Sequence, residues 1–327
     1  MCAEPFAYLP CANDGTVAVV DIATHKKTKS IDVGSSPFGI SVHPSGTRVY
    51  VANRGGNSLS IIDTAEGRVV TTVPVGVSPF GVAVHPNGSR VYVSNQQNSW
   101  DGESHDNGTV TVIDTQNNKP VRHIAIGAFP AGIALDAKGE RLFVVSGCAR
   151  WKGPGFSVID TQSNKVVARA CLKIKKADEE VDPLQAELAV SPVATVSHPK
   201  RERLYFSNRG TANVAVVDTE TYRVEKLIPV GKLPAGLAIA PDGATLYVAN
   251  KGKDTISVID TAKNEVRATV EVASSPYGVA VTPSGDRVLV ANVNSGTISV
   301  ISAESLRVTH SIDVGPSPYA LGMFVAK

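Results

Sequence analysis

The side chains best suited to chemistry in this 327-residue chain lie in one polar run, NQQNSWDGESHDNGTV at residues 95–110. The run places His105 close to Asp101 and Glu103, and an imidazole beside carboxylates can bind a cation weakly. The spacing is not that of a zinc site, and the run lacks the twelve-residue order and closing glutamate of an EF-hand. We therefore predict no metal, and interpret Trp100, Asp101, Glu103 and His105 as candidate ligand-binding residues.

A second candidate group lies in SGCARWKGPG at residues 146–155, where Cys148 is followed by Arg150 and Trp151. Cations near a thiol lower its pKa and favour the reactive thiolate. No neighbouring residue in the sequence is suited to act as the base for a nucleophilic Cys148. We therefore interpret Arg150 and Trp151 as candidate ligand-binding residues.

The four cysteines leave two arrangements open. In one, a Cys148–Cys171 disulfide fixes residues 146–155 in place, and Cys2 either pairs with Cys11 or is free. In the other, the cysteines are free thiols. Two disulfides would indicate an oxidising compartment, whereas free thiols would indicate the cytosol.

Composition and motif searches exclude several other classes of protein. The chain has 32 basic and 30 acidic residues, and no basic cluster indicates nucleic-acid binding. No apolar stretch approaches the 18 residues of a membrane span, and the N-terminal MCAEPFAYLP has no signal-peptide pattern. Patterns for nucleotide binding, zinc proteases, serine hydrolases and covalent haem attachment are all missing, so we predict no cofactor.

The elements that must position these residues are repeats. A strand-ending phrase, two apolar residues and then Asp, recurs at Asp21, Asp63, Asp114, Asp160, Asp218 and Asp260, with Ser302 in the seventh copy. The intervals are 42, 51, 46, 58, 42 and 42 residues. A second marker, the proline of an S-P-aromatic-G phrase, recurs at Pro37, Pro79, Pro130, Pro192, Pro234, Pro276 and Pro318. Two independent markers with one base period indicate a repeat architecture.

Each 42-residue copy holds four short runs that alternate apolar and polar residues, such as GVAV, RVLVAN, TISVIS and RVTHSIDV within residues 275–315. Alternation with Gly, Pro, Asn and Ser between runs is typical of an antiparallel meander, and four strands in 42 residues fit a propeller blade. We predict an all-β, seven-bladed propeller of four-stranded antiparallel blades that forms one domain over residues 1–327. Its ring is closed by the C-terminal strand joining the N-terminal blade, which is split between residues 4–34 and 317–327.

The strings RVYVANRGGNSLSIIDT (48–64) and TLYVANKGKDTISVIDT (245–261) resemble the YVTN-type β-propeller repeat family, which includes YncE-like and surface-layer-like proteins. The resemblance covers essentially the whole chain. It implies seven blades and a periplasmic, secreted or cell-surface protein. It does not imply one activity, because propellers carry many unrelated functions.

Three intervals exceed the base period, by 9, 4 and 16 residues, and strand alignment assigns these insertions to residues 95–110, 146–155 and 172–190. In an antiparallel four-stranded blade, all three project from the same face, on neighbouring blades. They indicate a rim or lid around a ligand, although neutral drift of surface loops gives the same pattern.

The repeated polar residues of the opposite face are predicted to be structural. The Asp that ends each third strand is suited to accept local backbone N–H groups in the following turn. His43, His85 and His198 share one repeat position in the turn after the first strand, on separate blades.

The residue after each marker proline begins the innermost strand and is expected to ring the mouth of the central channel. Four of these residues form an aromatic arc on neighbouring blades, and three are small: Phe38, Phe80, Tyr277 and Tyr319, then Ala131, Val193 and Ala235. A half-aromatic funnel is typical of a pocket for a small molecule or peptide. Alternatively, the rings plug the channel and serve packing alone.

Cations follow the second strand in three blades, as Arg54, Arg209 and Lys251. Together they suit an anionic ligand, although strand-end Arg and Lys are commonly just solvated. We include Arg209 and Lys251 with Phe38, Phe80, Tyr277 and Tyr319 among the candidate ligand-binding residues.

We predict a binding protein with a pocket at the channel mouth, under the inserted loops of blades 2 and 3. Its partner is a small molecule, a peptide or a protein. The alternative is an enzyme, a lactonase-like hydrolase, lyase or isomerase that uses polar residues of the same loops. The resemblance favours a periplasmic or extracellular location with a signal removed, and a cytoplasmic location stays open.

Overall fold

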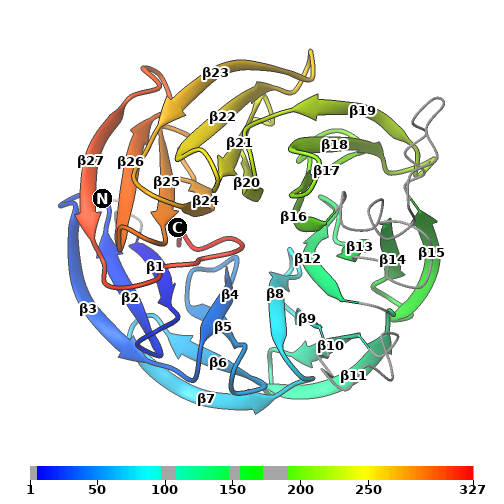
Figure 1. Cartoon of the computed structure of the whole chain (residues 1–327). Coiled ribbons are helices and arrows are strands. Elements are labelled where there is room, and N and C mark those ends of the chain that lie inside the picture. Colours follow the sequence, from blue (N-terminus) through cyan, green and yellow to red (C-terminus); the bar gives the residue numbers. More distant parts are fainter. Residues whose placement is uncertain (1–5, 97–107, 128, 147–154, 172–190, 327) are drawn as a thin grey trace.

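The computed structural model describes residues 6–96, 108–127, 129–146, 155–171 and 191–326, and Figure 1 shows a ring of antiparallel sheets around a central axis. Six sheets have four strands each, in sequence order from the channel outward, and no helix is present in the described ranges. The seventh sheet has three named strands, and residues 317–326 complete it. The seven-bladed propeller is confirmed.

Blade 1 consists of β4 (Pro37–Val42), β5 (Arg48–Asn53), β6 (Ser58–Asp63) and β7 (Arg68–Pro74). Blade 2 consists of β8 (Pro79–Val84), β9 (Arg90–Asn95), β10 (Thr109–Asp114) and β11 (Lys119–Ala125). Blade 3 consists of β12 (Pro130–Leu135), β13 (Arg141–Ser146), β14 (Gly155–Asp160) and β15 (Lys165–Cys171). Blade 4 consists of β16 (Pro192–Ser197), β17 (Arg203–Asn208), β18 (Asn213–Asp218) and β19 (Val224–Pro229). Blade 5 consists of β20 (Pro234–Ile239), β21 (Thr245–Asn250), β22 (Thr255–Asp260) and β23 (Glu265–Glu271). Blade 6 consists of β24 (Pro276–Val281), β25 (Arg287–Asn292), β26 (Thr297–Ser302) and β27 (Val308–Asp313). Blade 7 contains β1 (Phe6–Cys11), β2 (Thr16–Asp21) and β3 (Lys26–Asp32).

Both sequence markers fall where the repeat predicts. The marker prolines begin the inner strands of blades 1 to 6, and the marker Asp or Ser ends the third strand of each blade. Strands two and three are buried on both sides because neighbouring blades pack face to face, whereas outer strands such as β3 are exposed except for one aliphatic residue, Ile31. The period-2 pattern therefore marks strands of the ring, and burial on both sides explains why their polar positions hold small Ser and Thr.

The glycine of the S-P-aromatic-G phrase allows the inner strands to approach each other. A Cβ atom on Gly39 would lie 1.9 Å from the carbonyl oxygen of Phe80 in the next blade, and one on Gly236 would lie 2.3 Å from that of Tyr277. No side chain fits at these positions without moving a backbone.

The asparagine of the YVAN phrase is buried and fastens the second strand to the third. Asn53 Nδ2 donates to Ser58 Oγ at 3.1 Å and to Ser60 Oγ at 2.9 Å, and Asn250 makes the same pair of bonds in blade 5. Loss of such a buried amide leaves two hydroxyl oxygens without a donor and costs about 1–3 kcal/mol.

Residues 317–326 close the ring, as predicted, but they are shared between two blades. They bridge β1 at Ala7↔Val325 and Cys11↔Pro318, and they run parallel to β4 at Gly39↔Leu321. Ile40 N–H donates to Leu321 O at 2.9 Å, and Tyr8 N–H donates to Phe324 O at 2.8 Å. The closing segment therefore fastens blade 7 to blade 1 rather than forming an uninterrupted ladder with β1.

Candidate functional site

Two faces of the ring are named from here on. The insertion face holds the turns between second and third strands, such as residues 12–15, 54–57 and 251–254. The turn face holds the turns between third and fourth strands, which follow the marker Asp or Ser302. The register aligns Pro130 with Ser146, Ser146 with Gly155, and Gly155 with Cys171, so the segments that flank two insertions meet at one edge of blade 3. The flanks of the third insertion, Asn95 and Thr109, are paired in the same way in blade 2.

The four predicted aromatic residues meet at the channel mouth on the insertion face. The ring of Phe38 lies 4.5 Å from that of Phe80, 4.8 Å from that of Tyr319 and 5.5 Å from that of Tyr277, measured between centroids. Tyr277 and Tyr319 are 5.1 Å apart in an edge-to-face arrangement, and Tyr319 alone of the four is half-buried rather than buried. The rings therefore form a continuous aromatic floor, and their contact with a ligand stays a prediction.

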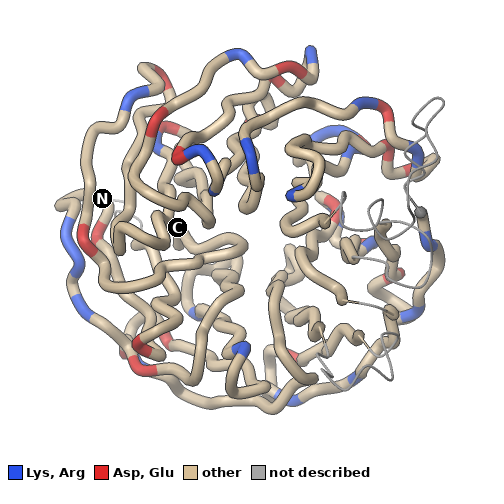
Figure 2. Tube along the Cα trace, in the orientation of Figure 1, with Lys and Arg blue, Asp and Glu red and all other residues tan. Residues whose placement is uncertain are grey.

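One backbone hydrogen bond holds the residue after the second strand over this floor. In six blades its N–H donates to the carbonyl oxygen of the residue before the marker proline: Ala12 to Ser317, Arg54 to Ser36, Gln96 to Ser78, Arg209 to Ser191, Lys251 to Leu233 and Val293 to Ser275. The bond brings the second strand's end next to the first strand's beginning. The repeat thereby presents three cations around the channel mouth, and Figure 2 shows basic positions at inner ends of blades on both sides of the opening.

Arg54 lies against the Phe38 and Phe80 side of the floor. Its Cζ is 5.9 Å from the Phe38 centroid and 5.8 Å from the Phe80 centroid. Its Nε donates to Ser78 Oγ at 3.1 Å and its Nη2 to Gln96 Oε1 at 3.2 Å. The guanidinium is thus oriented by neutral groups.

Lys251 and Arg209 lie on the Tyr277 side. Lys251 Nζ is 5.7 Å from the Tyr277 ring centroid. Burial lowers the pKa of the Lys251 ammonium, and the charge of Arg209 lowers it further. Burial raises the pKa of Tyr277, partly opposed by Arg209 and Arg54, so its phenol is neutral. In the described part of the chain no carboxylate forms an ion pair with Arg54, Arg209 or Lys251.

The loop residues predicted to bind ligand lie outside the described residues. These are Trp100, Asp101, Glu103, His105, Arg150 and Trp151, and the same holds for Cys148 and for the side chain of Cys171. The predicted disulfide is therefore untested. Cys11 is described, and it is a buried free thiol.

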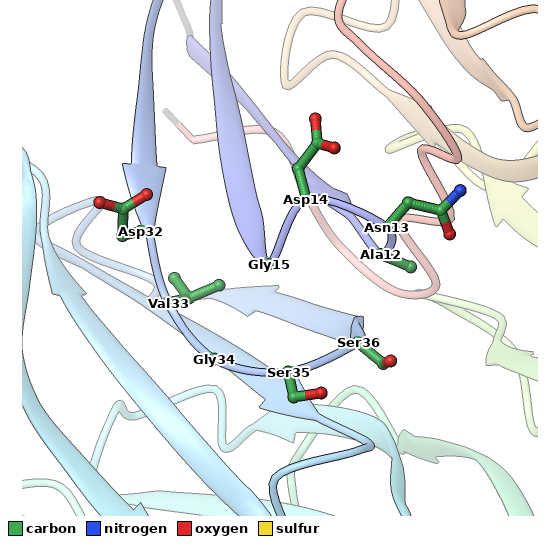
Figure 3. Close-up of a pocket in the computed structure, with 9 residues that line it drawn as sticks. All are labelled: Ala12, Asn13, Asp14, Gly15, Asp32, Val33, Gly34, Ser35 and Ser36. Carbon is green, nitrogen blue, oxygen red and sulfur yellow. The ribbon is translucent and has the colours of Figure 1, made fainter.

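A cavity of about 690 Å³ lies on the insertion face where blade 7 meets blade 1, and sequence reasoning missed it. Figure 3 shows its lining, with Asp14 on the β1–β2 turn, Asp32 at the end of β3 and Ser36 on the link to blade 1. In blade 1 the corresponding turn residue is Asn57, whose Oδ1 accepts the Ser78 N–H at 2.9 Å. Blade 7 has Gly15 there, at φ +67°, so no side chain spans the gap. Glycine alone is no signal for the cavity, because Gly296 holds the same repeat position in blade 6, also at φ +67°.

A second cavity, of about 650 Å³, lies on the turn face between blades 5, 6 and 7. His25 and His310 stack in its wall with centroids 3.5 Å apart and planes 8° from parallel. Burial lowers the pKa of His25, and His310 and Arg287 lower it further. His25 and His310 lie near opposite ends of the chain, and the repeat pattern did not predict that they would be in contact.

Elsewhere on the turn face the repeated polar residues are structural, as predicted. Asp218 Oδ1 accepts the N–H groups of Glu220 and Thr221, and Asp260 Oδ1 accepts those of Ala262 and Lys263. The histidines of the first-strand turn also link blades, because His43 Nε2 bonds to Gly88 O at 3.1 Å and His85 Nε2 to Gly139 O at 3.0 Å.

The described residues contain no cluster of three or more His, Cys, Asp or Glu placed to hold a metal ion. None of their segments forms a helix of the length and apolarity that crossing a membrane requires.

Comparison with known proteins identifies the family. Residues 6–100 and 219–309 match the family described as "Lactonase, 7-bladed beta-propeller". The chain belongs to this family. Proteins called "Uncharacterized protein YncE" from Salmonella typhi and Salmonella typhimurium are each 28% identical to it over 149 residues. The match covers 36% of this chain and 41% of the length of those curated relatives.

Solved structures share the fold over nearly the full length. A chain of the hydrazine synthase of Kuenenia stuttgartiensis superposes with a TM-score of 0.76 at 20% identity, covering 92% of this chain and 96% of that one. A functionally unknown protein from Desulfotomaculum acetoxidans gives a TM-score of 0.75 at 14% identity, covering 96% and 97%. Identities this low show the propeller fold alone.

Proposed function

We propose that this propeller binds an anionic small molecule at the channel mouth on its insertion face. The observation that carries the proposal is the group of three cations, Arg54, Arg209 and Lys251, above an aromatic floor. Each lacks a carboxylate partner in the described part of the chain. The charge of Arg209 acts on Lys251 and on Tyr277, and an anion bound there would relieve the repulsion between the two cations.

The floor and the cations contribute differently to binding. The aromatic rings exclude water from one side of the site, which strengthens the attraction between a cation and an anion there. Arg54 is already oriented by Ser78 and Gln96, so it loses little side-chain freedom when an anion binds. The inserted loops of blades 2 and 3, including Trp100, His105 and Trp151, are proposed to cover the bound ligand.

Isothermal titration calorimetry with oxalate as the probe tests the anion site. We expect the wild-type protein to bind oxalate and the R209Q/K251M variant to bind it about a hundredfold more weakly, because two charged contacts are lost. The K232M/K253M variant is the matched control, since both lysines are exposed on nearby loops. Equal affinities of wild type and R209Q/K251M would contradict the proposal.

The role of the inserted loops needs a separate variant, W100A/H105A/W151A. We expect unchanged thermal unfolding and a clear loss of oxalate affinity. Unchanged affinity would show that the loops do not cover the site, while leaving the cation group as the anion site.

Catalysis is a second candidate, favoured by the family description, which contains the word lactonase. A lactonase-like hydrolase, lyase or isomerase would draw its acid and base from the inserted loops. Turnover of a lactone by wild type, and its loss in W100A/H105A/W151A, would support this alternative over binding alone. A periplasmic or extracellular location likewise stays a prediction.

A further inference from the structure

Two kinds of side chain join neighbouring blades on the turn face. Between blades 3 and 4, Arg141 Nη1 donates to Thr219 O at 2.6 Å, and Arg287 holds blade 6 to blade 7 in the same way. Between blades 2 and 3 the bond is made by a histidine, because His85 Nε2 bonds to Gly139 O at 3.0 Å. Arginine keeps its charge throughout the physiological pH range, whereas histidine titrates close to neutrality. The blade 2–3 junction is therefore held by a group that can change its charge.

The hydrogen bonds of His85 fix which ring nitrogen carries the proton. Asn87 N–H donates to His85 Nδ1 at 3.2 Å, and a backbone N–H can only donate. Nδ1 must therefore present its lone pair, so the proton is on Nε2, which donates to Gly139 O. A Cβ atom on Gly139 would lie 2.6 Å from Nε2, so the ring rests directly on blade 3. One neutral tautomer thus closes the turn of its own blade and fastens that turn to the next blade.

An imidazolium cannot make the same pair of bonds. Protonation places a second N–H on Nδ1, facing the Asn87 N–H with no acceptor between them. The charged ring is a stronger donor to Gly139 O, which opposes its release. The ring must nevertheless rotate to separate the two donors, and that rotation carries Nε2 away from the carbonyl oxygen. We therefore expect both bonds to be lost together.

Two other histidines occupy the same repeat position and differ from His85. His43 Nδ1 accepts the Ser45 N–H at 3.1 Å, but Ser45 Oγ is also 2.7 Å from Nδ1 and can accept from a protonated ring. His198 is buried, and burial lowers its pKa, so this ring resists protonation. Three cations act on His198 in the same direction: Arg201, Arg203 and Lys200. Of the three rings, His85 is the one that the structure leaves most sensitive to acid.

The charged groups on the elements packed against His85 do not titrate in the same range. They are Arg90 with Asp114 in blade 2, and Lys138, Glu140 and Arg141 with Asp136 and Glu202 in blade 3. Carboxylates stay ionised, and lysine and arginine stay protonated, at the pH values where histidine ordinarily takes up a proton. A response of this junction to mild acid therefore belongs to His85.

We propose that His85 is an acid-released latch between blades 2 and 3, which opens the turn face at this junction while the junctions held by arginine stay closed. Only hydrogen bonds and one proton change hands. The closed turn is favoured above about pH 6.5 and weakens as pH falls below it, because the open form binds the additional proton. The latch lies on the turn face and does not depend on the proposed anion site.

Solution NMR of the full chain tests the latch. Long-range proton–nitrogen correlation spectra distinguish the two neutral tautomers, and we expect the His85 proton on Nε2 at about pH 7.5. From there to about pH 5.5, solvent exchange of the Asn87 N–H, divided by its intrinsic rate at each pH, should rise about tenfold. The Ala244 N–H is the internal control, because it donates at 2.9 Å to Asp242 Oδ1 in the corresponding turn of blade 5, and a carboxylate keeps its lone pairs in this range.

The H85N variant separates the latch from other effects of pH. Its amide oxygen can accept the Asn87 N–H but does not titrate, so the rise in exchange should vanish. H123N is the matched control, since His123 is exposed on β11 of the same blade, and it should respond as wild type does. Equal responses of Asn87 and Ala244 in wild type, or a proton on Nδ1 at about pH 7.5, would overturn the latch. A rise that persists in H85N would do the same. No anion enters these measurements, so their outcome is independent of the proposed function.

Discussion

On the turn face, Arg48, Arg90 and Arg141 each lie against a carboxylate, whereas on the insertion face Arg209 and Lys251 lie against none in the described part of the chain. The positions are comparable because each set occupies one position of the repeat. One set begins the second strand of a blade and the other follows its end. β17 shows both, since Arg203 at its start pairs with Glu225 at 2.9 Å and Arg209 follows its end.

The turn-face cations stabilise the ring between blades. Arg141 Nη1 donates to Thr219 O at 2.6 Å, and Arg287 Nη1 donates to Ile22 O at 2.9 Å, in each case in the following blade. On the insertion face the corresponding links are backbone bonds and neutral side chains, which leaves charge available for a ligand. In a repeat protein, function can thus be sought where a charged repeat position has no internal partner.

The largest effect is expected from removing a turn-face cation. R141A deletes bonds to Asp136, Glu202 and Thr219, so the free energy of unfolding should fall by about 1.5–3 kcal/mol. Oxalate affinity should not change, because the site is at the other end of the strand. Urea unfolding and calorimetry measure the two quantities, and a parallel loss of affinity would break the comparison between the faces.

Supplying a carboxylate on the insertion face should make it resemble the turn face. Gln96 Oε1 already accepts from Arg54 Nη2, so Q96E converts this neutral bond into an ion pair without changing side-chain length. We expect oxalate affinity to fall about tenfold, or about 1.4 kcal/mol, with the melting temperature unchanged or slightly raised. Q96A is the control, and it should weaken binding less because it adds no negative charge.

Acidic pH should lower the stability contributed by the turn face, and alkaline pH should lower oxalate binding at the insertion face. Thr221 N–H and Lys263 N–H hold the pKa of Asp218 and Asp260, respectively, below the ordinary carboxyl value, because they bond to the charged form. The unfolded chain then binds more protons in acid, so the stability contributed by these groups is present above the ordinary Asp pKa and is lost as pH falls below it. D260N should reduce this acid dependence in unfolding experiments.

At alkaline pH, the insertion face should lose affinity instead. The pKa of Lys251 in the free protein is lowered, and a bound anion favours the ammonium, so binding takes up a proton. Oxalate affinity should therefore fall as pH rises through that lowered pKa. K251R should abolish this dependence because arginine stays charged, and a pH-dependent K251R would contradict the assignment.

The smallest effect concerns the turn-face cavity. Arg287 pairs in register with Ser302, where blades 1 and 2 place Asp63 and Asp114 opposite their arginines. S302D should restore the ion pair and raise the free energy of unfolding by about 0.2–1 kcal/mol. In an R287A background the gain should vanish, and a double-mutant cycle measures that coupling.

The repeat predicted most of the fold and, for the candidate site, the common repeat position of its three cations. The spacing of Asp and Pro markers located strands, blade number and ring closure, because each copy meets the same neighbours. It also placed Arg54, Arg209 and Lys251 at one repeat position. It could not predict that Arg54 bonds to Gln96, since this depends on how far one blade leans toward the next.

Long-range contacts account for the rest. Phe38 and Tyr319 touch only because the closing segment lies beside β4, and sequence spacing carries no information on that distance. Likewise, the hollow beside Gly15 lies where blade 7 meets blade 1, and glycine at the same repeat position in blade 6 shows that the sequence alone does not locate it.

The closing segment has a consequence for synthesis of the protein. Tyr319, which supplies one ring of the floor, leaves the ribosome after blades 1 to 6 have been made. Phe38 then gains its third ring contact and Tyr277 its second only when residues 317–326 dock between blades 1 and 7. The floor of the proposed anion site is therefore complete only in molecules that have left the ribosome and closed the ring.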